Sequence, residues 1–417
     1  MAKQHSARAW RMLTINGVWF GVSFLWNSVH PILLPMLLGD LTQTSQNTYF
    51  GLLTFVGLIV ALMVQPISGA FSDRTVHHLG RRRPWMLMGL CFGLVCLWGM
   101  ALSRSLWELA LSYVLLQFFS NLLHGPAQGL IPDLVPAGQR GVASGIKSLI
   151  DMLGVVAAAL TVSRLMGGQL SHTLLAIGVV SVVWLGATLW TVVGADEPSP
   201  AGTRGPRLSV RALLRDVFAL QVHAHGDYAR LLLARFCVLL GTYMVQSFAY
   251  FILADGLHLA NPARAVGNIQ TMIGLSLMVA AVPAGWLSEH YGRKRLSLVA
   301  EVIVAVGLTG LAATHSATTL APLGCLIGLG MGIFTSVNWA WATDLVPPDE
   351  AAKYLGLSNL ATAGTSATSR LAGPIIDAVN ARLANGGYLM LLLLAIVSVL
   401  VAIPITSHID KERRMPV

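Results

Sequence analysis

Long apolar segments, separated by short polar connections, run along the whole chain. A helix that spans a bilayer needs about 20 mostly apolar residues, whereas a barrel strand needs about ten with alternating polarity. Backbone amides in lipid must be satisfied within the segment itself, so each continuous segment is predicted to be a helix. The predicted spans are 12–37, 47–71, 84–103, 107–131, 141–166, 172–194, 229–254, 266–288, 294–314, 319–343, 351–378 and 387–408. The pattern therefore predicts an all-α membrane protein with twelve transmembrane helices.

Basic residues are concentrated on one side of this topology. One set of connections contains Arg74, Arg81, Arg82, Arg83, Arg140, Arg204, Arg207, Arg211, Arg215, Arg230, Arg293, Lys294 and Arg295. The terminal residues on the same side include Lys3, Arg8, Arg11, Lys411, Arg413 and Arg414. The opposite side holds Arg104, Arg264 and Arg382, with Arg164 near a helix end. The positive-inside rule predicts that the basic side and both termini are cytoplasmic.

The composition agrees with a membrane protein and excludes other classes. Of 417 residues, 55% are hydrophobic and 11% are charged, against about 25% charged in a soluble domain. The net charge of +9 follows from the basic connections, so no nucleic-acid partner is expected. The cysteines lie inside apolar segments, and the chain has no nucleophile elbow, phosphate loop or HExxH motif. We therefore expect no enzyme activity, no cofactor and no metal site.

Two sequence stretches recur half a chain apart. Gly69-Ala-Phe-Ser72-Asp73-Arg74 and the following Gly80-Arg81-Arg82-Arg83 are echoed by Gly285-Trp-Leu-Ser288-Glu289 and Gly292-Arg293-Lys294-Arg295, and Asp133-Leu-Val-Pro136 recurs as Asp344-Leu-Val-Pro347. This repetition predicts two six-helix bundles related by a pseudo-two-fold axis along the membrane normal. The predicted domains are an N-terminal bundle at 1–194, a linker at 195–228 and a C-terminal bundle at 229–417. Within the linker, the spacing of basic and apolar residues predicts a short amphipathic helix on the lipid surface.

The repeated loop motif resembles that of the major facilitator superfamily. Val64-Gln-Pro66-Ile-Ser-Gly69, Gly80-Arg81-Arg82-Arg83-Pro84-Trp85 and Asn121-Leu-Leu-His-Gly125-Pro126 resemble the plant-sucrose-transporter-like branch of the glycoside–pentoside–hexuronide cation symporters. The resemblance implies the major facilitator fold, alternating access and sugar uptake driven by a proton gradient. It also implies a membrane-embedded acid in helix four, where this chain has Gln117. An amide cannot cycle a proton, so the implied mechanism lacks its usual carboxylate.

Polar side chains follow one face of several predicted spans at helical spacing. Amides, hydroxyls and aromatic rings suit a neutral, polyhydroxylated ligand because they supply donors, acceptors and stacking faces. The predicted substrate-binding residues are Asn27, Gln117, Asn121, His124, Tyr243, Gln246, Tyr250, Asn338, Trp339, Asn359 and Arg370. The alternative for each is a hydrogen bond between helices.

Lys147 and Asp151 lie four residues apart in the span 141–166, and therefore one above the other on a helix. This spacing predicts either an internal ion pair or a titratable carboxylate that replaces the acid absent at Gln117. His30 is a further candidate for proton coupling, because histidine titrates near neutral pH. We name Asp151, Lys147 and His30 as the coupling candidates.

Two other charged residues inside spans have open assignments. Arg370 is expected to pair with Asp151, to hold a ligand hydroxyl or to reach Asp377 on its own helix. Glu301 is expected to form a structural gate pair with the basic residues at 293–295. An unpaired charge at either position would be costly in lipid.

The loop motifs predict a cytoplasmic gate. A carboxylate at a helix end can cap a neighbouring helix and accept an arginine, which would latch one conformational state. The predicted gate residues are Asp73, Arg74, Arg81, Arg82, Arg83, Asp133, Glu289, Arg293 and Asp344.

Three functions remain open. The first is uptake of a sugar, either a disaccharide or a glycoside, coupled to a proton or another cation. The second is export of drugs or lipids, or uniport, on the same fold. Antiporters of that kind usually carry a Gly-Pro-containing signature in helix five, and residues 141–166 contain no proline. The third is a membrane assembly or sensing factor that transports nothing. The short loops and absent glycosylation sequons favour a bacterial inner membrane, and we expect a monomer that contacts the lipid bilayer.

Overall fold

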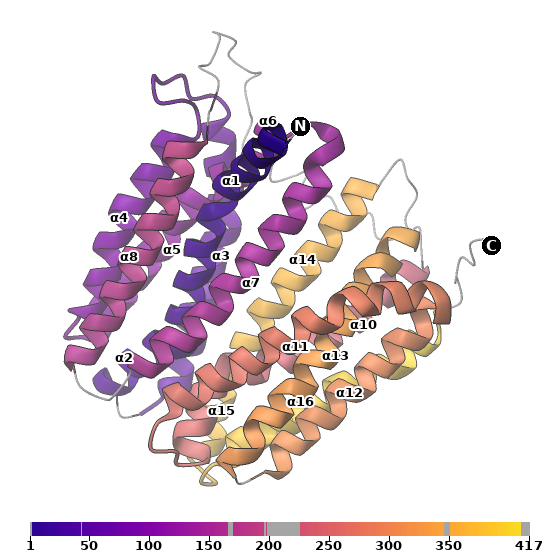
Figure 1. Ribbon diagram of the computed structural model, residues 1–417. Helices are drawn as coiled ribbons and strands as arrows, with labels where there is room; N and C mark the ends of the chain where they lie inside the picture. Colours follow the sequence, from indigo (N-terminus) through magenta and orange to yellow (C-terminus); the bar gives the residue numbers. More distant parts are fainter. Residues whose placement is uncertain are drawn as a thin grey trace. The chain divides into compact units, whose positions relative to one another are not determined.

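The computed structural model describes residues 2–42, 44–165, 170–195, 197, 226–314, 316–345 and 351–409. Within these ranges all regular secondary structure is helical (Figure 1). The prediction of an all-α protein is therefore confirmed. The amphipathic helix predicted in the linker lies outside the described residues.

The chain divides into two compact units. The first unit comprises Met1–Gln43 and Leu53–Leu220, and the second comprises Thr44–Leu52 and Gln221–Val417. Helices that lie wholly in the first unit are α1 (Ala2–Ser28), α2 (Leu34–Leu41), α4 (Arg83–Ala101), α5 (Leu106–Gln128), α6 (Leu130–Leu134), α7 (Arg140–Leu165) and α8 (Leu170–Gly194). A π-helical segment, Val29–Leu33, joins α1 to α2, and a single 3₁₀ turn, Ala137–Gln139, precedes α7.

The second unit repeats this helical organisation. Its helices are α10 (Gly226–Phe251), α11 (Pro262–Tyr291), α12 (Arg293–Ala313), α13 (Ala317–Leu345), α14 (Ala351–Arg370), α15 (Ala372–Asn380) and α16 (Gly386–Ser407). A second π-helical segment, Ile252–Gly256, follows α10. The start of α11 carries a side-chain cap, because the Asn261 side chain accepts a hydrogen bond from the Arg264 backbone N–H at 3.0 Å.

Eleven helices in the described part of the chain are long and apolar enough to cross a membrane. The remaining predicted span, 351–378, is divided into α14 and α15 at Leu371. Pro374 explains the break, because it has no N–H to donate to the carbonyl of Arg370. Asp377 therefore lies on α15 and does not continue the polar face of α14.

Helix α3 (Gln46–Ser72) contributes its first turns to the second unit and its remainder to the first. Within the second unit, Asp377 caps the start of α3. Its carboxylate accepts hydrogen bonds from the Thr48 N–H at 2.7 Å and from the Asn47 amide at 2.9 Å. Asp377 therefore serves as a helix cap at the start of α3.

Small residues allow close helix packing in the second unit. Gly328 of α13 lies so close to α11 that a Cβ atom there would be 2.4 Å from the carbonyl oxygen of Ile273. Gly332, one turn later, makes the same approach to Leu277 at 2.6 Å. In lipid, helices associate mainly through such van der Waals contact between backbones, because hydrocarbon already solvates apolar side chains.

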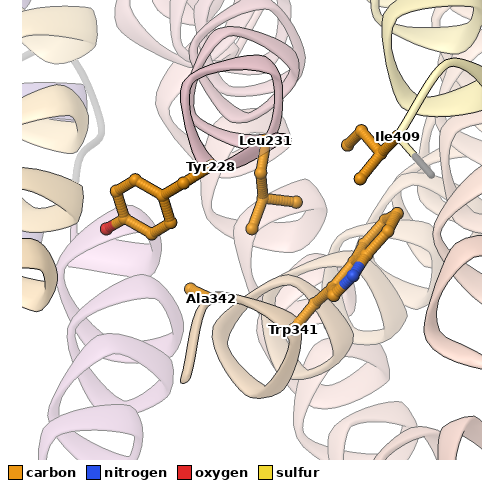
Figure 2. Close-up of a cluster of buried hydrophobic side chains, with 5 residues drawn as sticks. All are labelled: Tyr228, Leu231, Trp341, Ala342 and Ile409. Atoms are coloured by element: carbon orange, nitrogen blue, oxygen red, sulfur yellow. The ribbon is translucent and has the colours of Figure 1, made fainter. Parts of the chain in front are cut away.

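A small apolar cluster joins α10 to the end of α13 (Figure 2). It contains Tyr228 and Leu231 of α10, Trp341 and Ala342 of α13, and Ile409 beyond α16. The Tyr228 hydroxyl lies 2.9 Å from the hydroxyl of Ser358, so its polar end is satisfied inside the bundle. This cluster fixes the start of α10, which carries the polar residues described below.

Candidate functional site

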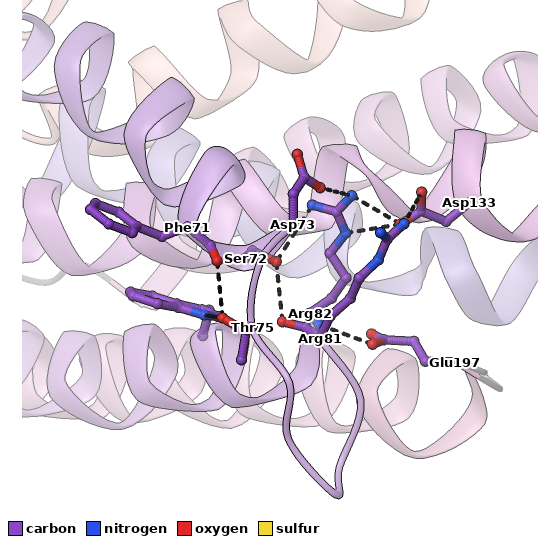
Figure 3. Close-up of polar contacts among 9 residues, drawn as sticks. Phe71, Ser72, Asp73, Thr75, Arg81, Arg82, Asp133 and Glu197 are labelled. Atoms are coloured by element: carbon purple, nitrogen blue, oxygen red, sulfur yellow. Dashed lines mark hydrogen bonds and ion pairs between the residues drawn. The ribbon is translucent and has the colours of Figure 1, made fainter. Parts of the chain in front are cut away.

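Arg82 is the centre of an ion-pair cluster in the first unit (Figure 3). Its side chain is only 6% exposed and lies between Asp73, at 2.5 Å, and Asp133, at 2.9 Å. Arg81 also reaches Asp133, at 2.5 Å. The Arg82 N–H, at the start of α4, donates to the Glu197 carboxylate at 2.9 Å. These contacts, which we call the Arg82 cluster, bind the loop after α3 to α6 and to Glu197, which lies beyond the end of α8.

The second unit contains a smaller counterpart, the Arg293 pair. Arg293 donates to Asp344 at 3.2 Å and also donates to Ser288. Arg293 therefore makes the same two contacts as Arg82, which bonds to Asp133 and to Ser72. In the aligned repeat, however, Arg293 directly follows the glycine and so corresponds in position to Arg81. Among the predicted gate residues, Glu289 is exposed and Arg83 donates to the Ala195 carbonyl. Arg74 is half-buried in the loop after α3.

A buried polar network lies between α1, α3 and α5 in the first unit. His30 belongs to the π-helical segment, and its Nε2 lies 2.9 Å from the Tyr113 hydroxyl and 3.3 Å from the Gln117 amide nitrogen. Its ring stacks on Trp26, with centroids 4.8 Å apart. π-Helical turns interrupt the regular backbone pattern and are frequent at functional sites. His30 and Gln117, predicted separately, are therefore neighbours.

The network continues along α5. Asn121 donates to the Gln117 side-chain oxygen at 3.2 Å and accepts from Gln65 of α3 at 2.6 Å. A Cβ atom at Gly57 would lie 2.8 Å from Gln117, so this glycine allows α3 to approach the network. Because Gln117 and Asn121 are buried and also contact His30 and Gln65 on other helices, the helix-to-helix alternative describes their contacts here.

Lys147 and Asp151 form an ion pair at 2.9 Å on α7. The other Asp151 oxygen accepts from Ser23 of α1 at 2.9 Å. The Lys147 ammonium also lies 4.0 Å from the centroid of the Trp19 ring, whose edge contacts His124. Both side chains of the pair remain about 30% exposed. The pair therefore has charge compensation, a cation–π contact and access for a proton or a ligand.

Arg235 of α10 is a nearly buried cation, 9% exposed, in the second unit. Its Nη1 donates to Asn338 of α13 at 2.8 Å, and its Nε donates to Thr362 of α14 at 3.1 Å. Its guanidinium carbon lies 5.9 Å from the centroid of Trp339, and Tyr243 is within electrostatic reach. Asn338 and Trp339, both predicted as binding residues, are therefore grouped around an arginine that the sequence argument overlooked.

The other predicted binding residues occupy different surroundings. Asn27 donates to the Ser23 carbonyl on its own helix at 2.8 Å. Gln246 lines a mostly apolar cavity of about 60 Å³ together with Thr242 and Gln270. Tyr250 packs its ring against Phe251.

On α14, Asn359 is exposed, whereas Arg370 donates to the Ser366 carbonyl at 2.6 Å. Tyr243 and Tyr250, which lie in the same predicted span as Gln246, do not line the cavity that Gln246 lines.

Glu301 does not form the expected gate pair. Its carboxylate is fully buried and its described contacts are to the hydroxyls of Thr406 and Ser297. Arg293 is bound to Asp344 instead. Two turns of α12 separate Glu301 from Arg293, about 12 Å at a rise of 1.5 Å per residue, which explains why the sequence proximity was misleading.

Sequence reasoning overlooked Arg235, Tyr113 and Gln65. Arg235 carried the clearest signal, because it is a charge inside the predicted span 229–254. Tyr113 lies four residues before Gln117 and therefore on the same predicted face. Gln65 became recognisable only when its partner on α5, Asn121, was known.

A family model described as MFS/sugar transport protein matches residues 21–375. A multi-drug resistance efflux pump PmrA homolog of Lactococcus lactis is 23% identical over 374 residues, which cover 86% of each protein. Proton-associated sugar transporter A of Homo sapiens is 30% identical over 36% of this chain and 22% of that protein. Sucrose transport protein SUT5 of Oryza sativa is 32% identical over 29% of this chain and 27% of that protein.

Solved structures agree on the fold. A bacterial homolog of the human lysosomal transporter Spinster aligns over 96% of both chains with a TM-score of 0.72 at 14% identity. That similarity concerns the fold alone, whereas the family model covers most of this sequence. The chain therefore belongs to the MFS/sugar transport protein family, and it is a multi-pass membrane transporter with the major facilitator fold.

Proposed function

We propose that the protein takes up a sugar by alternating access, driven by a proton gradient. The family model and two of the curated relatives carry sugar transport in their descriptions, which supports a sugar as the solute. The human relative is described as proton-associated, which supports the coupling. A bacterial inner membrane, cytoplasmic termini and a monomeric state remain predictions.

The observation that carries the proposal is the site around Arg235. The buried Asn338 amide nitrogen has no acceptor among the described residues, and within these ranges Arg235 donates through its Nε and Nη1, which leaves Nη2 for a ligand. The amide nitrogen calls for a partner, because a buried polar group without one is costly. The hydroxyl oxygens of a sugar can accept from both groups while its ring stacks on Trp339, which is 39% exposed.

The described carboxylates of the second unit are engaged elsewhere or exposed. Asp227 pairs with Arg230, Asp255 accepts from Tyr388, Glu301 accepts from Thr406, Asp344 pairs with Arg293, Asp377 caps α3, and Glu289 is exposed. None contacts Arg235 within the described ranges. An internal ion pair with one of these acids therefore does not account for the buried charge of Arg235. This favours a bound ligand as its partner.

We assign proton coupling to the Asp151–Lys147 pair. Protonation of Asp151 would end its attraction to Lys147 and release the ammonium toward Trp19 or a ligand. The pair lies on a membrane-spanning helix and retains partial exposure, as a group that exchanges protons requires. The Arg82 cluster and the Arg293 pair are proposed to latch one conformational state, each within its own unit.

The test is uptake of labelled disaccharides and glycosides into proteoliposomes, with and without an imposed pH gradient. We expect one sugar to accumulate only with the gradient. Asp151→Asn should abolish accumulation while still allowing equilibration, whereas the matched control Asp227→Asn, at the start of α10, should behave as wild type. Accumulation by Asp151→Asn contradicts the coupling assignment, and equilibration by the wild type indicates a uniporter.

Export of a hydrophobic compound is the second candidate, because the efflux pump homolog matches over 86% of the chain. The same proteoliposomes distinguish it when loaded with a fluorescent cationic dye and given the opposite gradient. Dye movement without sugar uptake would favour the exporter. Transport of neither solute would favour an assembly or sensing role.

A further inference from the structure

Glu301 is a carboxyl group enclosed in the interior of the second unit. It lies on the third turn of α12, a helix long and apolar enough to cross the membrane, and it is 0% exposed. A carboxylate in such a place is very costly unless a cation or several donors compensate it. Its surroundings therefore show which protonation state the site accommodates.

The contacts of Glu301 are hydroxyl groups, and they reach one oxygen only. Thr406 Oγ1 of α16 lies 2.6 Å from Oε1, and Ser297 Oγ lies 3.4 Å from the same atom. Oε2 is fully enclosed and has no hydrogen-bond partner among the described residues. An ionised carboxylate would leave half of its charge on that oxygen without a donor.

No described cation compensates the charge. On its own helix, Arg293 binds Asp344, Lys294 donates to the Ile409 carbonyl, and Arg295 is exposed. Helices α11, α13 and α16 pack against α12. Their other titratable residues are Arg264, Glu289, His290, Tyr291, Cys325, Asp344 and Tyr388, with His408 directly after α16. The thiol of Cys237, on α10, is within electrostatic reach but carries no positive charge.

We propose that Glu301 is a proton-binding site and that its carboxyl group is neutral in this state of the protein. A proton on Oε1 makes that oxygen a donor to Thr406, and Oε2 becomes a carbonyl oxygen without a formal charge. Both observations, the single bonded oxygen and the absent cation, follow from the neutral form. The site differs from Asp151, whose carboxylate has Lys147 at 2.9 Å.

Exchange of this proton requires movement within the second unit. The carboxyl group of Glu301 is 0% exposed and bonded to Thr406 of α16, so water reaches it only when the packing of α12 against α16 opens. Proton release from Glu301 is therefore tied to a conformational change. The site does not depend on which solute is carried, and its test needs no substrate.

The test is infrared spectroscopy of the purified full-length protein in lipid nanodiscs at neutral pH. We expect the wild type to show the C=O stretch of a protonated carboxyl group, and we expect Glu301→Gln to lose it. Glu289→Gln, which removes the exposed glutamate of α11, is the matched control and should leave the band unchanged. Thr406→Val should retain the band and shift its frequency, because the hydrogen-bond partner is lost.

The outcomes separate the two protonation states. Identical carboxyl spectra for wild type and Glu301→Gln would overturn the proposal, as would a band that Glu289→Gln removes. If Glu301→Gln does not fold, Thr406→Val tests the proposal instead. A C=O band at the wild-type frequency in Thr406→Val would also overturn the proposal. In D₂O the carboxyl proton of Glu301 should exchange more slowly in the wild type than in Thr406→Val. The reason is that the hydrogen bond between Thr406 and Glu301 restricts the separation of α12 and α16.

Discussion

The Arg82 cluster and the Arg293 pair arise from the same repeated sequence, yet they differ in burial and in the number of partners. Arg82 is 6% exposed and contacts two carboxylates, whereas Arg293 is 19% exposed and contacts one, at 3.2 Å. Asp344 itself is 39% exposed. A buried, multiply bonded arginine is costly to disturb, whereas an exposed pair contributes little. The duplication therefore conserved the chemistry of the contact without conserving its strength.

Two local differences explain the contrast. Ser72 and Arg82 are separated by a loop, which brings Asp73 against the guanidinium. In the second unit, Gly292 alone joins α11 to α12, so the chain has no room for such a loop. Gly129 further provides the space into which the Arg82 side chain fits.

Substitution of the central arginine should give the largest difference between the units. Arg82→Gln leaves Asp73 without its described arginine partner and removes the buried donors to Asp133. We expect a loss of about 3 kcal/mol in unfolding free energy, the magnitude for a broken buried ion pair. Thermal unfolding of the detergent-purified protein measures it. A loss below that of Arg293→Gln would contradict the ranking.

Filling the space at Gly129 should have the next largest effect. A Cβ atom there would lie 2.3 Å from the guanidinium carbon of Arg82, so Gly129→Ala forces the arginine out of place. We expect a cost of roughly 1–3 kcal/mol, as for an overpacked core. The control is Gly145→Ala on α7, where nothing lies within 4 Å and a gain of about 0.5–1 kcal/mol is expected. Equal effects at the two glycines would exclude the packing explanation.

Removing the cap of α4 should cost less. The Glu197 carboxylate accepts from the Arg82 N–H, and Glu197→Ala leaves that donor without its partner. We expect a loss of about 1 kcal/mol, typical of a helix cap. Glu197→Gln retains an acceptor oxygen and should lose only a few tenths of that amount. If both variants unfold at the wild-type temperature, the cap contributes nothing to this cluster.

The sequence predicted the helices well because their signals are local. Continuous apolar length located the spans, and repeated motifs identified Asp133 and Asp344 as related residues. The break at Leu371 was missed, although Pro374 marks it, because apolarity continues through the turn. Hydropathy reports the length of a segment and not whether its backbone hydrogen bonds are continuous.

The candidate site was less predictable, because its geometry depends on contacts between helices. Lys147 and Asp151 were paired from spacing alone, which determines neighbours on one helix. Arg235 required the positions of Asn338 and Thr362, which belong to two other helices. Glu301 was assigned to nearby basic residues, but burial between α12 and α16 determines its contacts. Sequence distance is a poor guide wherever tertiary packing selects the partner.

The Arg293 pair should show the smallest effect, and a double-mutant cycle measures it directly. Arg293→Gln, Asp344→Asn and the combined variant should give a coupling energy of about 0.2–1 kcal/mol, because the pair is partly exposed. The same cycle at Arg82 and Asp133 should give a larger value, since these groups are more buried and joined by two contacts. Raising the salt concentration should reduce the first coupling energy more than the second, because water and ions screen exposed charges. Equal coupling energies with equal salt dependence would mean that burial does not distinguish the two copies of the motif.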